Sequence, residues 1–180
     1  MCFKIKQVQI LDKVKTNCMR SWFQNCLYLT TLINFQNLDV SDCKDFSYAF
    51  YSCLNLNSLV PLKDWNVSNG QDFEFMFGYC KLLIDIISLS NWDVSSVEDF
   101  SSMFNGCKSL INIEMGNWNV SNGKYFSNMI CNCICLKIIQ LPNTLKNLNY
   151  QIFKYCNSNL NISWKGKNYM YDDLLEYQEF

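Results

Sequence analysis

Cysteine is the residue type in this sequence with the widest chemical capacity. The chain of 180 residues contains 11 cysteines and no histidine. The lack of histidine excludes a Ser-His-Asp triad, a Cys-His pair and a histidine-ligated zinc ion. Thiolates alone can bind soft metal ions, and Cys131, Cys133 and Cys135 form a close run of three. Because no fourth thiol lies at a recognised spacing, a thiolate metal or redox protein is a remote alternative and we predict no cofactor.

Six of the 11 cysteines occupy one recurring position, including Cys133 of the run. Its members are Cys26, Cys53, Cys80, Cys107, Cys133 and Cys156. The first four follow one another at intervals of 27 residues, and Trp65 and Trp92 keep the same interval. A fixed period of about 20 to 50 residues is the signature of a repeat protein. Each of these cysteines is therefore expected to be a small buried side chain of the repeat, and the tryptophans are expected to be core residues as well.

Each copy of the repeat contains a predicted helix and a predicted strand. Phe100, Met103, Phe104 and Cys107 have the i, i+3, i+4, i+7 spacing of one helix face. Two pairs preceding equivalent helices match the Ser-x-x-Glu/Gln capping box. These pairs are Ser68 with Gln71 and Ser95 with Glu98. The aliphatic stretches 83–89 and 110–115 predict short strands after the cysteines.

Stacked copies of such a unit would share one core and place their strands side by side. We therefore predict an α/β fold, a leucine-rich-repeat-like right-handed solenoid with a parallel β-sheet on one face and short helices on the other. The whole chain, 1–180, is predicted to be one domain. It divides into a capping strand at 1–10, about five repeats of 26–27 residues at 11–141, an atypical repeat at 142–164 that ends in a strand at 160–164, and an acidic tail at 165–180. A polar column before the tryptophans is expected to bond the main chain of the adjacent coil; it comprises Asn37, Asp64, Asn91 and Asn117.

The repeat resembles a known family. One copy reads Asn91, Trp92, Asp93, Val94, Ser95, then Phe100, Met103, Phe104 and Cys107, followed by Leu110 and Ile113. This pattern is similar to the BspA-type leucine-rich repeat, over roughly residues 11 to 160. The resemblance implies a curved α/β solenoid located at the cell surface or secreted, active in adhesion or protein binding, and it brings no catalytic residues.

The composition argues against nucleic acid and membrane insertion. The chain carries 15 basic and 16 acidic residues, a net charge of -1, and no basic run that would attract nucleic acid. No window approaches the roughly 18 apolar residues that a membrane span needs. The first residues lack the apolar stretch of a secretory signal, so the sequence by itself predicts a cytoplasmic location.

The exposed face of the strands is the predicted binding site. An inward column is expected to comprise Leu32, Leu59, Ile86, Ile113 and Ile139. The outward residues predicted to contact a protein partner are Ile33, Ser58, Val60, Asp85, Ile87, Asn112 and Glu114. The adjacent aliphatic side chains of Ile33, Val60 and Ile87 would form the centre of that footprint. Alternatively, the extra residue of the 27-residue copies makes a bulge that turns these side chains inward.

The sequence thus predicts a non-enzymatic protein-binding or adhesion module. The main alternative is a structural surface-array or spacer protein that associates with itself through the same aliphatic strip.

Overall fold

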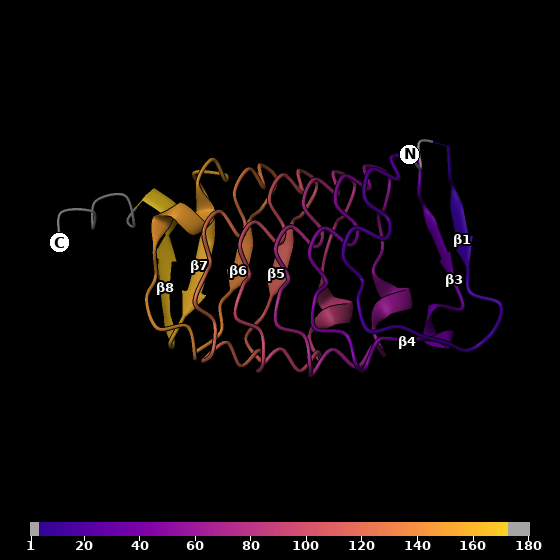
Figure 1. Ribbon diagram of the computed structural model, residues 1–180. Coiled ribbons are helices and arrows are strands. Elements are labelled where there is room, and N and C mark those ends of the chain that lie inside the picture. Colours follow the sequence, from indigo (N-terminus) through magenta and orange to yellow (C-terminus); the bar gives the residue numbers. More distant parts are fainter. Residues whose placement is uncertain (1–3, 173–180) are drawn as a thin grey trace.

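Residues 4–172 are described by the computed structural model, in which the chain runs through successive coils that lie side by side along one axis (Figure 1). Backbone hydrogen bonds connect each coil to the next. The Phe50 N–H donates to the Met76 carbonyl at 2.8 Å, and the Phe77 N–H donates to the Met103 carbonyl at 3.0 Å. Donor and acceptor are 26 residues apart in both pairs, so neighbouring coils pack in a constant register.

The segment predicted to be helical is instead a run of tight turns. The N–H groups of Met103 and Cys107 each donate to the carbonyl three residues earlier, at 3.2 Å. Between them, the Phe104 N–H donates across to the Met129 carbonyl of the next coil at 2.8 Å. Further backbone hydrogen bonds between neighbouring coils join Phe46 to Asp72, Tyr48 to Glu74, Phe73 to Asp99, Phe75 to Ser101 and Ser102 to Ser127. Alternate residues therefore close a turn and bond to the neighbouring coil.

The backbone conformation explains why the helix prediction is wrong. Ser102 and Gly106 have φ values of 55° and 73°, in the left-handed region that cannot continue a right-handed helix. Equivalent positive values recur in the other coils, at Ser21, Asn25, Tyr48, Ser52, Phe75, Tyr79, Asn128, Asn132 and Tyr155. The run of turns still buries Phe100, Met103, Phe104 and Cys107. Its pattern of buried positions is thus the one that a helix would produce.

The predicted capping boxes are replaced by turns built on aspartate and asparagine. The Ser95 N–H donates to Oδ1 of Asp93 at 3.0 Å. Hydrogen bonding by the Ser95 side chain, and secondly by this N–H, lowers the pKa of Asp93. The Ser68 N–H makes the same bond to Asn66 at 3.2 Å. The Asn/Asp-Val-Ser motif therefore encodes a side-chain turn and does not begin a helix.

Short strands and 3-10 turns alternate along the coils. The strands are β1 (Gln7–Gln9), β2 (Val14–Lys15), β3 (Thr31–Ile33), β4 (Leu38–Asp39), β5 (Asn112–Glu114), β6 (Ile138–Gln140), β7 (Asn161–Trp164) and β8 (Lys167–Met170). The 3-10 turns are η1 (Phe35–Asn37), η2 (Val60–Leu62), η3 (Ile87–Leu89) and η4 (Tyr150–Phe153). Parallel pairing joins β1 to β3, β2 to β4, and β5 to β6 to β7, while β8 pairs with β7 antiparallel.

Strands are interrupted in the central coils, where a continuous sheet was predicted. There η2 and η3 occupy the predicted strand positions, and a single bridge joins Asp85 to Asn112. Both 3-10 turns occur in 27-residue copies, although the 27-residue copy that ends at Leu38 contains strand β3 as well as η1. The 27-residue copies that end at Trp65 and Trp92 contain a 3-10 turn, whereas the 26-residue copy that ends at Trp118 contains β5 without one. The extra residue of these 27-residue copies is accommodated in the 3-10 turn.

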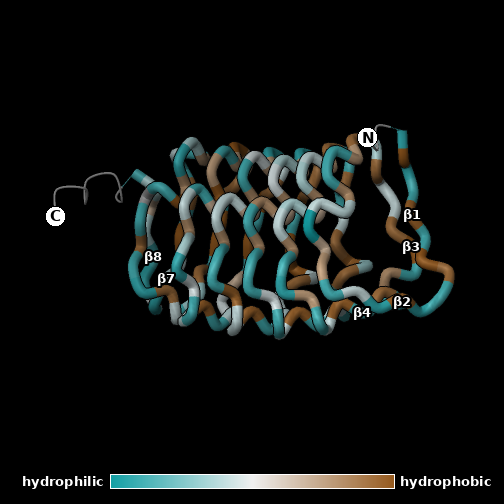
Figure 2. Tube along the Cα trace, viewed as in Figure 1, coloured by the Kyte–Doolittle hydropathy of each residue, from teal (hydrophilic) through white to brown (hydrophobic). Residues whose placement is uncertain are grey.

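Aromatic side chains fill the core in files that cross the coils. Phe23, Phe50, Phe77 and Phe104 stack with centroid separations of 5.1, 5.6 and 5.7 Å. A second file contains Phe46, Phe73, Phe100 and Phe126, separated by 5.2, 6.3 and 5.2 Å. Figure 2 shows the corresponding pattern along the chain, in which polar and apolar stretches recur from coil to coil. The stacked repeats thus share one core.

The two ends depart from the central pattern. Strand β1 pairs with β3 and covers the first coil, within the segment predicted as a capping strand, although residues 1–3 lie outside the described part. At the other end, β7 matches the predicted last strand. The predicted tail begins with β8 instead, because Lys165 and Gly166, with φ of 49° and 74°, reverse the chain. Residues 173–180 of that tail lie outside the described part. Within 4–172, no helix has the length and apolar character that a membrane crossing requires.

Candidate functional site

Five of the six recurring cysteines are buried, as predicted, whereas Cys156 in the atypical last repeat is partly exposed. The Cys107 side chain is fully buried, and its thiol donates to the Phe77 carbonyl of the preceding coil at 3.2 Å. Burial raises the pKa of Cys107 to about 12 and raises that of Cys80 well above its usual value. Thiolate is the reactive form, so these two thiols are chemically quiet at neutral pH. Equivalent thiol–carbonyl bonds are made by Cys53, Cys80, Cys133 and Cys156.

The run of three cysteines does not form a metal site. Cys131 is buried, Cys135 is exposed, and the Cys133 thiol donates to the Phe104 carbonyl at 3.2 Å. Across residues 4–172 no group of three or more potential ligand side chains is close enough to hold a metal ion. Cys131 and Cys133 are both buried and only Cys135 faces solvent, a difference that the sequence spacing could not reveal.

The tryptophans are core residues, as predicted, but the polar column before them is not the predicted ladder. The Trp92 indole N–H donates to the Leu62 carbonyl at 3.1 Å, with the ring almost fully buried. In the polar column Asn37 bonds the adjacent coil, to the Ile10 carbonyl at 3.3 Å, whereas Asp64 and Asn91 are exposed. Asparagines after the Val-Ser pair make the inter-coil bond instead. These are Asn69, to the Ser41 carbonyl at 2.8 Å, and Asn122, to the Ser95 carbonyl at 2.7 Å.

The predicted binding face has the predicted exposure. All five residues of the inward column are buried. Val60 and Ile87 are each 58% exposed and Ile33 is partly exposed, so the alternative that turns them inward is wrong. In place of a bulge, the 3-10 turns η2 and η3 begin at Val60 and Ile87 and leave both side chains exposed.

Polar residues of this face also shape the backbone. The Ser58 hydroxyl accepts the Val60 N–H at 3.3 Å, and Asp85 Oδ1 accepts the Ile87 N–H at 3.2 Å. These hydrogen bonds lie at the start of the two 3-10 turns, η2 and η3. Asn112 and Glu114 are exposed on β5, where the strand is regular. The seven predicted residues therefore lie on one exposed side of the coils, some of them with a turn-forming role in addition.

An apolar groove that the sequence reasoning missed lies next to this face. Its floor contains Leu82, Ile84, Ile111, Ile134 and Cys135, all exposed. The coils align these side chains, because the Ile111 N–H donates to the Ile84 carbonyl at 3.0 Å and the Lys137 N–H donates to the Ile111 carbonyl at 2.9 Å. The sequence does carry a signal for the groove, because an aliphatic residue recurs two positions before the inward column, at Ile84 and Ile111.

One lysine lines the groove and two more are sequence neighbours of lining residues. Lys137 lines it, and Lys81 and Lys108 precede Leu82 and Ser109, which also line it. On the other side of the groove, the predicted face begins with the exposed Asp85 and Asn112. The groove therefore has an apolar floor, and Lys137 is the charged residue in its lining.

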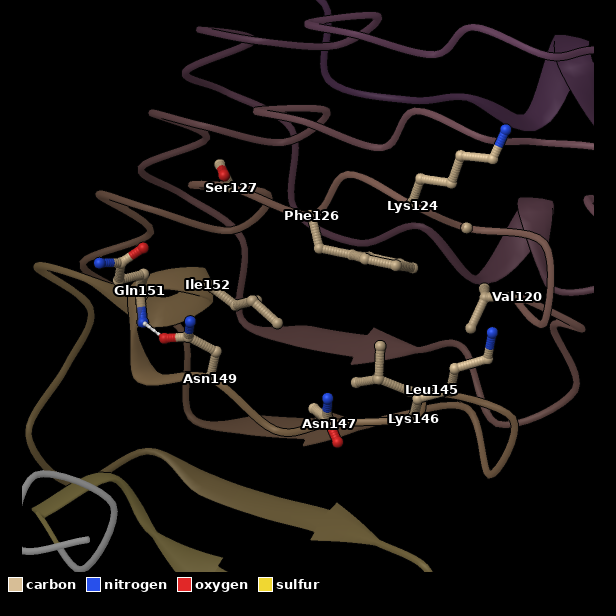
Figure 3. Close-up of a pocket in the computed structure, with 11 residues that line it drawn as sticks. Val120, Lys124, Phe126, Ser127, Leu145, Lys146, Asn147, Asn149, Gln151 and Ile152 are labelled. Carbon is tan, nitrogen blue, oxygen red and sulfur yellow. Dashed lines mark hydrogen bonds between the residues drawn. The ribbon is translucent and has the colours of Figure 1, made fainter. Parts of the chain in front are cut away.

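A second hollow lies near the C-terminal end of the stack (Figure 3). Its volume is about 340 Å³. Side chains of Val120, Phe126, Leu145 and Ile152 point into it, and polar groups of Lys146, Asn147 and Asn149 surround them. This hollow arises where the regular repeat gives way to the atypical one.

Comparison with protein families identifies the repeat. The model of the family described as "Mycoplasma protein of unknown function, DUF285" matches residues 2–88 and again residues 86–164. The chain belongs to this family. The two adjoining matches agree with the internal repetition of the sequence, and DUF285 membership by itself assigns no activity. No curated protein and no solved structure matches the chain.

Proposed function

We propose that this DUF285 chain is a non-enzymatic, leucine-rich-repeat-like solenoid that binds a protein partner along the apolar groove and the adjoining predicted face. The observation that carries the proposal is the contiguous exposed aliphatic floor of the groove, in particular Leu82, Ile84 and Ile111, which are 46%, 48% and 39% exposed. Isolated exposed aliphatic residues are common on protein surfaces. A contiguous set with a polar rim is typical of an interaction surface.

The charges around the groove favour a particular kind of partner. Lys137 in the lining, with the exposed Lys81 and Lys108 next in sequence to the lining residues Leu82 and Ser109, would attract acidic side chains, and the floor would take aliphatic or aromatic ones. The partner segment is therefore expected to combine acidic and apolar residues. Opposite charges at the rim mainly speed association and select among partners, while the buried apolar contacts supply most of the affinity.

Repeat architecture supports the same function. Stacked coils build an extended surface whose side chains vary while the core motif stays constant, which suits protein recognition. The resemblance to BspA-type repeats is consistent with binding or adhesion. Location at the cell surface, which the resemblance also implies, belongs to this proposal.

Substitutions in the groove test the proposal. Ile84→Glu and Lys108→Glu should each leave the fold intact, since both side chains are exposed. Ile84→Glu should abolish or strongly reduce capture of the partner from a cell extract measured by quantitative mass spectrometry, and Lys108→Glu should reduce it less. Val14→Glu, a change of an exposed aliphatic residue in β2, is the matched control and should keep capture unchanged. Equal capture by all four proteins would refute the proposed surface.

The predicted face is tested by Ile87→Arg. This variant should keep its thermal stability and lose partner capture, because the side chain is in solvent at the start of η3. Light scattering over a range of concentrations distinguishes partner binding from the main alternative, a structural protein that associates with itself. Oligomers that grow with concentration and disappear in Ile87→Arg would favour a self-associating structural protein over a partner-binding one.

A further inference from the structure

The hollow of Figure 3 has its origin in a shortened repeat. The Phe104 N–H donates to the Met129 carbonyl, and in the next coil the Ile130 N–H donates to the Ile152 carbonyl. These bonds make Ile152 the equivalent of Met129, so Asn149 occupies the position that Phe126 holds in the preceding coil. The last coil therefore has no ring to continue the file of Phe46, Phe73, Phe100 and Phe126.

The last coil is also shorter than the preceding one, which enlarges the hollow. The Met115 N–H donates to the Gln140 carbonyl and the Leu141 N–H to the Ser163 carbonyl, which makes Met115 and Leu141 equivalent. Eleven positions separate Met115 from Phe126, but only eight separate Leu141 from Asn149. The chain between Leu141 and Asn149 is thus too short to cover Phe126 as the earlier copies cover their phenylalanines.

Phe126 is left partly exposed as a result. Phe100 is fully buried between Phe73 and Phe126, whereas Phe126 has a ring neighbour on one side, Phe100 at 5.2 Å. The hollow of about 340 Å³ lies against it. A dry cavity of about 150 Å³ is enough to bind benzene, so this hollow has room for an aromatic ring with a short polar substituent.

The rim of the hollow has a positive charge. Lys124 and Lys146 line it, and none of its lining residues is acidic. Lys124 is engaged by Glu98 at 2.8 Å, whereas Lys146 takes part in none of the ion pairs found within residues 4–172. Figure 3 shows the Lys146 side chain beside Leu145, next to the apolar floor, with Asn147 also at the rim.

We propose that this hollow is a binding site for an aromatic carboxylate, whose ring stacks on Phe126 as the next member of the phenylalanine file. The carboxylate of the ligand pairs with Lys146 and accepts a hydrogen bond from the Asn147 amide. The contact for the ring is the parallel stacking that Phe100 and Phe126 make at 5.2 Å, in a file whose two earlier pairs meet edge-on. The site is separate from the groove and does not depend on the proposed partner binding.

N-acetyl-L-phenylalanine is a suitable probe, titrated into the intact chain labelled with ¹³C at its methyl groups. We expect a Kd on the order of 1 mM and shifts of the Val120, Leu145 and Ile152 methyl signals. N-acetyl-L-alanine, which has the charge without the ring, should cause no such shifts. Methyl shifts of equal size with N-acetyl-L-alanine, or none with N-acetyl-L-phenylalanine, would overturn the proposal.

Two variants sharpen the test. Asn149→Phe supplies the missing ring from within and should abolish the methyl shifts. Lys146→Met should weaken N-acetyl-L-phenylalanine about five-fold and leave its uncharged amide unaffected. The exposed Lys146 tolerates substitution, so this second variant decides the matter if Asn149→Phe does not fold. Unchanged binding in Lys146→Met, or undiminished shifts in a folded Asn149→Phe, would contradict the site. A pentapeptide that ends in phenylalanine, run in parallel, shows whether a chain terminus or a free aromatic acid is the better ligand.

Discussion

Replacement of Phe104 by alanine tests whether the aromatic files hold the coils together. Phe104 is fully buried and stacks on Phe77 at 5.7 Å with an interplanar angle of 8°. Truncation of a buried phenylalanine to alanine costs about 3 to 5 kcal/mol, and loss of a stacked aromatic pair accounts for about 0.5 to 1.5 kcal/mol beyond burial. Domains are stable by about 5 to 15 kcal/mol, so Phe104→Ala should lose a large part of the total.

Urea denaturation followed by tryptophan fluorescence is the assay. We expect the free energy of unfolding of Phe104→Ala to fall by about 4 kcal/mol relative to the natural chain. Tyr125→Ala, a change of a side chain that is 58% exposed, is the control and should shift it by less than about 0.5 kcal/mol. A loss below about 1 kcal/mol for Phe104→Ala would refute the packing described for the core.

Two further predictions concern titratable side chains. Under native conditions a thiol reagent should modify the exposed Cys135 readily and should reach Cys80 and Cys107 only on unfolding; modification of all three at similar rates would contradict their burial. Burial, together with the nearby acidic side chains of the adjacent coils, raises the pKa of Asp72 above its ordinary value of 3.8. Its contribution to stability is therefore greatest below that value and is lost as the pH rises through the folded pKa. Asp72→Asn keeps the oxygen that accepts the Glu74 N–H, so its melting temperature relative to the natural chain should rise between about pH 3 and about pH 7, and a relative fall would show that the sign is wrong.

The repeat and its buried positions could be predicted from the sequence, because they depend on spacing alone. Cys107, Phe104 and Ile113 are buried where the period of 27 places them. The local backbone could not be predicted in the same way. A helix and a run of turns both bury residues at i, i+3, i+4 and i+7, and the left-handed positions that distinguish them hold glycine at Gly106 but serine at Ser102.

That choice of residues is energetically unusual. A left-handed residue other than glycine costs about 1 to 2 kcal/mol, so Ser102 gave no sequence signal for the turn. Hydrogen bonds between coils offset this cost, since they leave few backbone N–H groups of the turns unpaired. Such bonds depend on the neighbouring coil, which is information that no single copy contains.

The exposed face of the strands could be predicted from the sequence by alternation, whereas the groove and the hollow could not. Val60 and Ile87 were identified because they follow the inward column in strict alternation. Ile84 lies two residues before Ile86 in the predicted strand 83–89, so alternation would turn it inward, whereas it is 48% exposed because the chain there is not a regular strand. The hollow beside Phe126 results from residues that the last coil lacks, and a deletion leaves no motif to find.

A hydrogen-bond scalar coupling between the backbone nitrogen of Phe77 and the carbonyl carbon of Met103, measured by NMR on ¹⁵N,¹³C-labelled protein, tests the central claim most directly. Phe77 donates to Met103 at 3.0 Å across the two coils, so the coupling should be detected. A coupling from Phe77 to the carbonyl of Phe73 instead would identify an α-helix and contradict the stack of hydrogen-bonded turns.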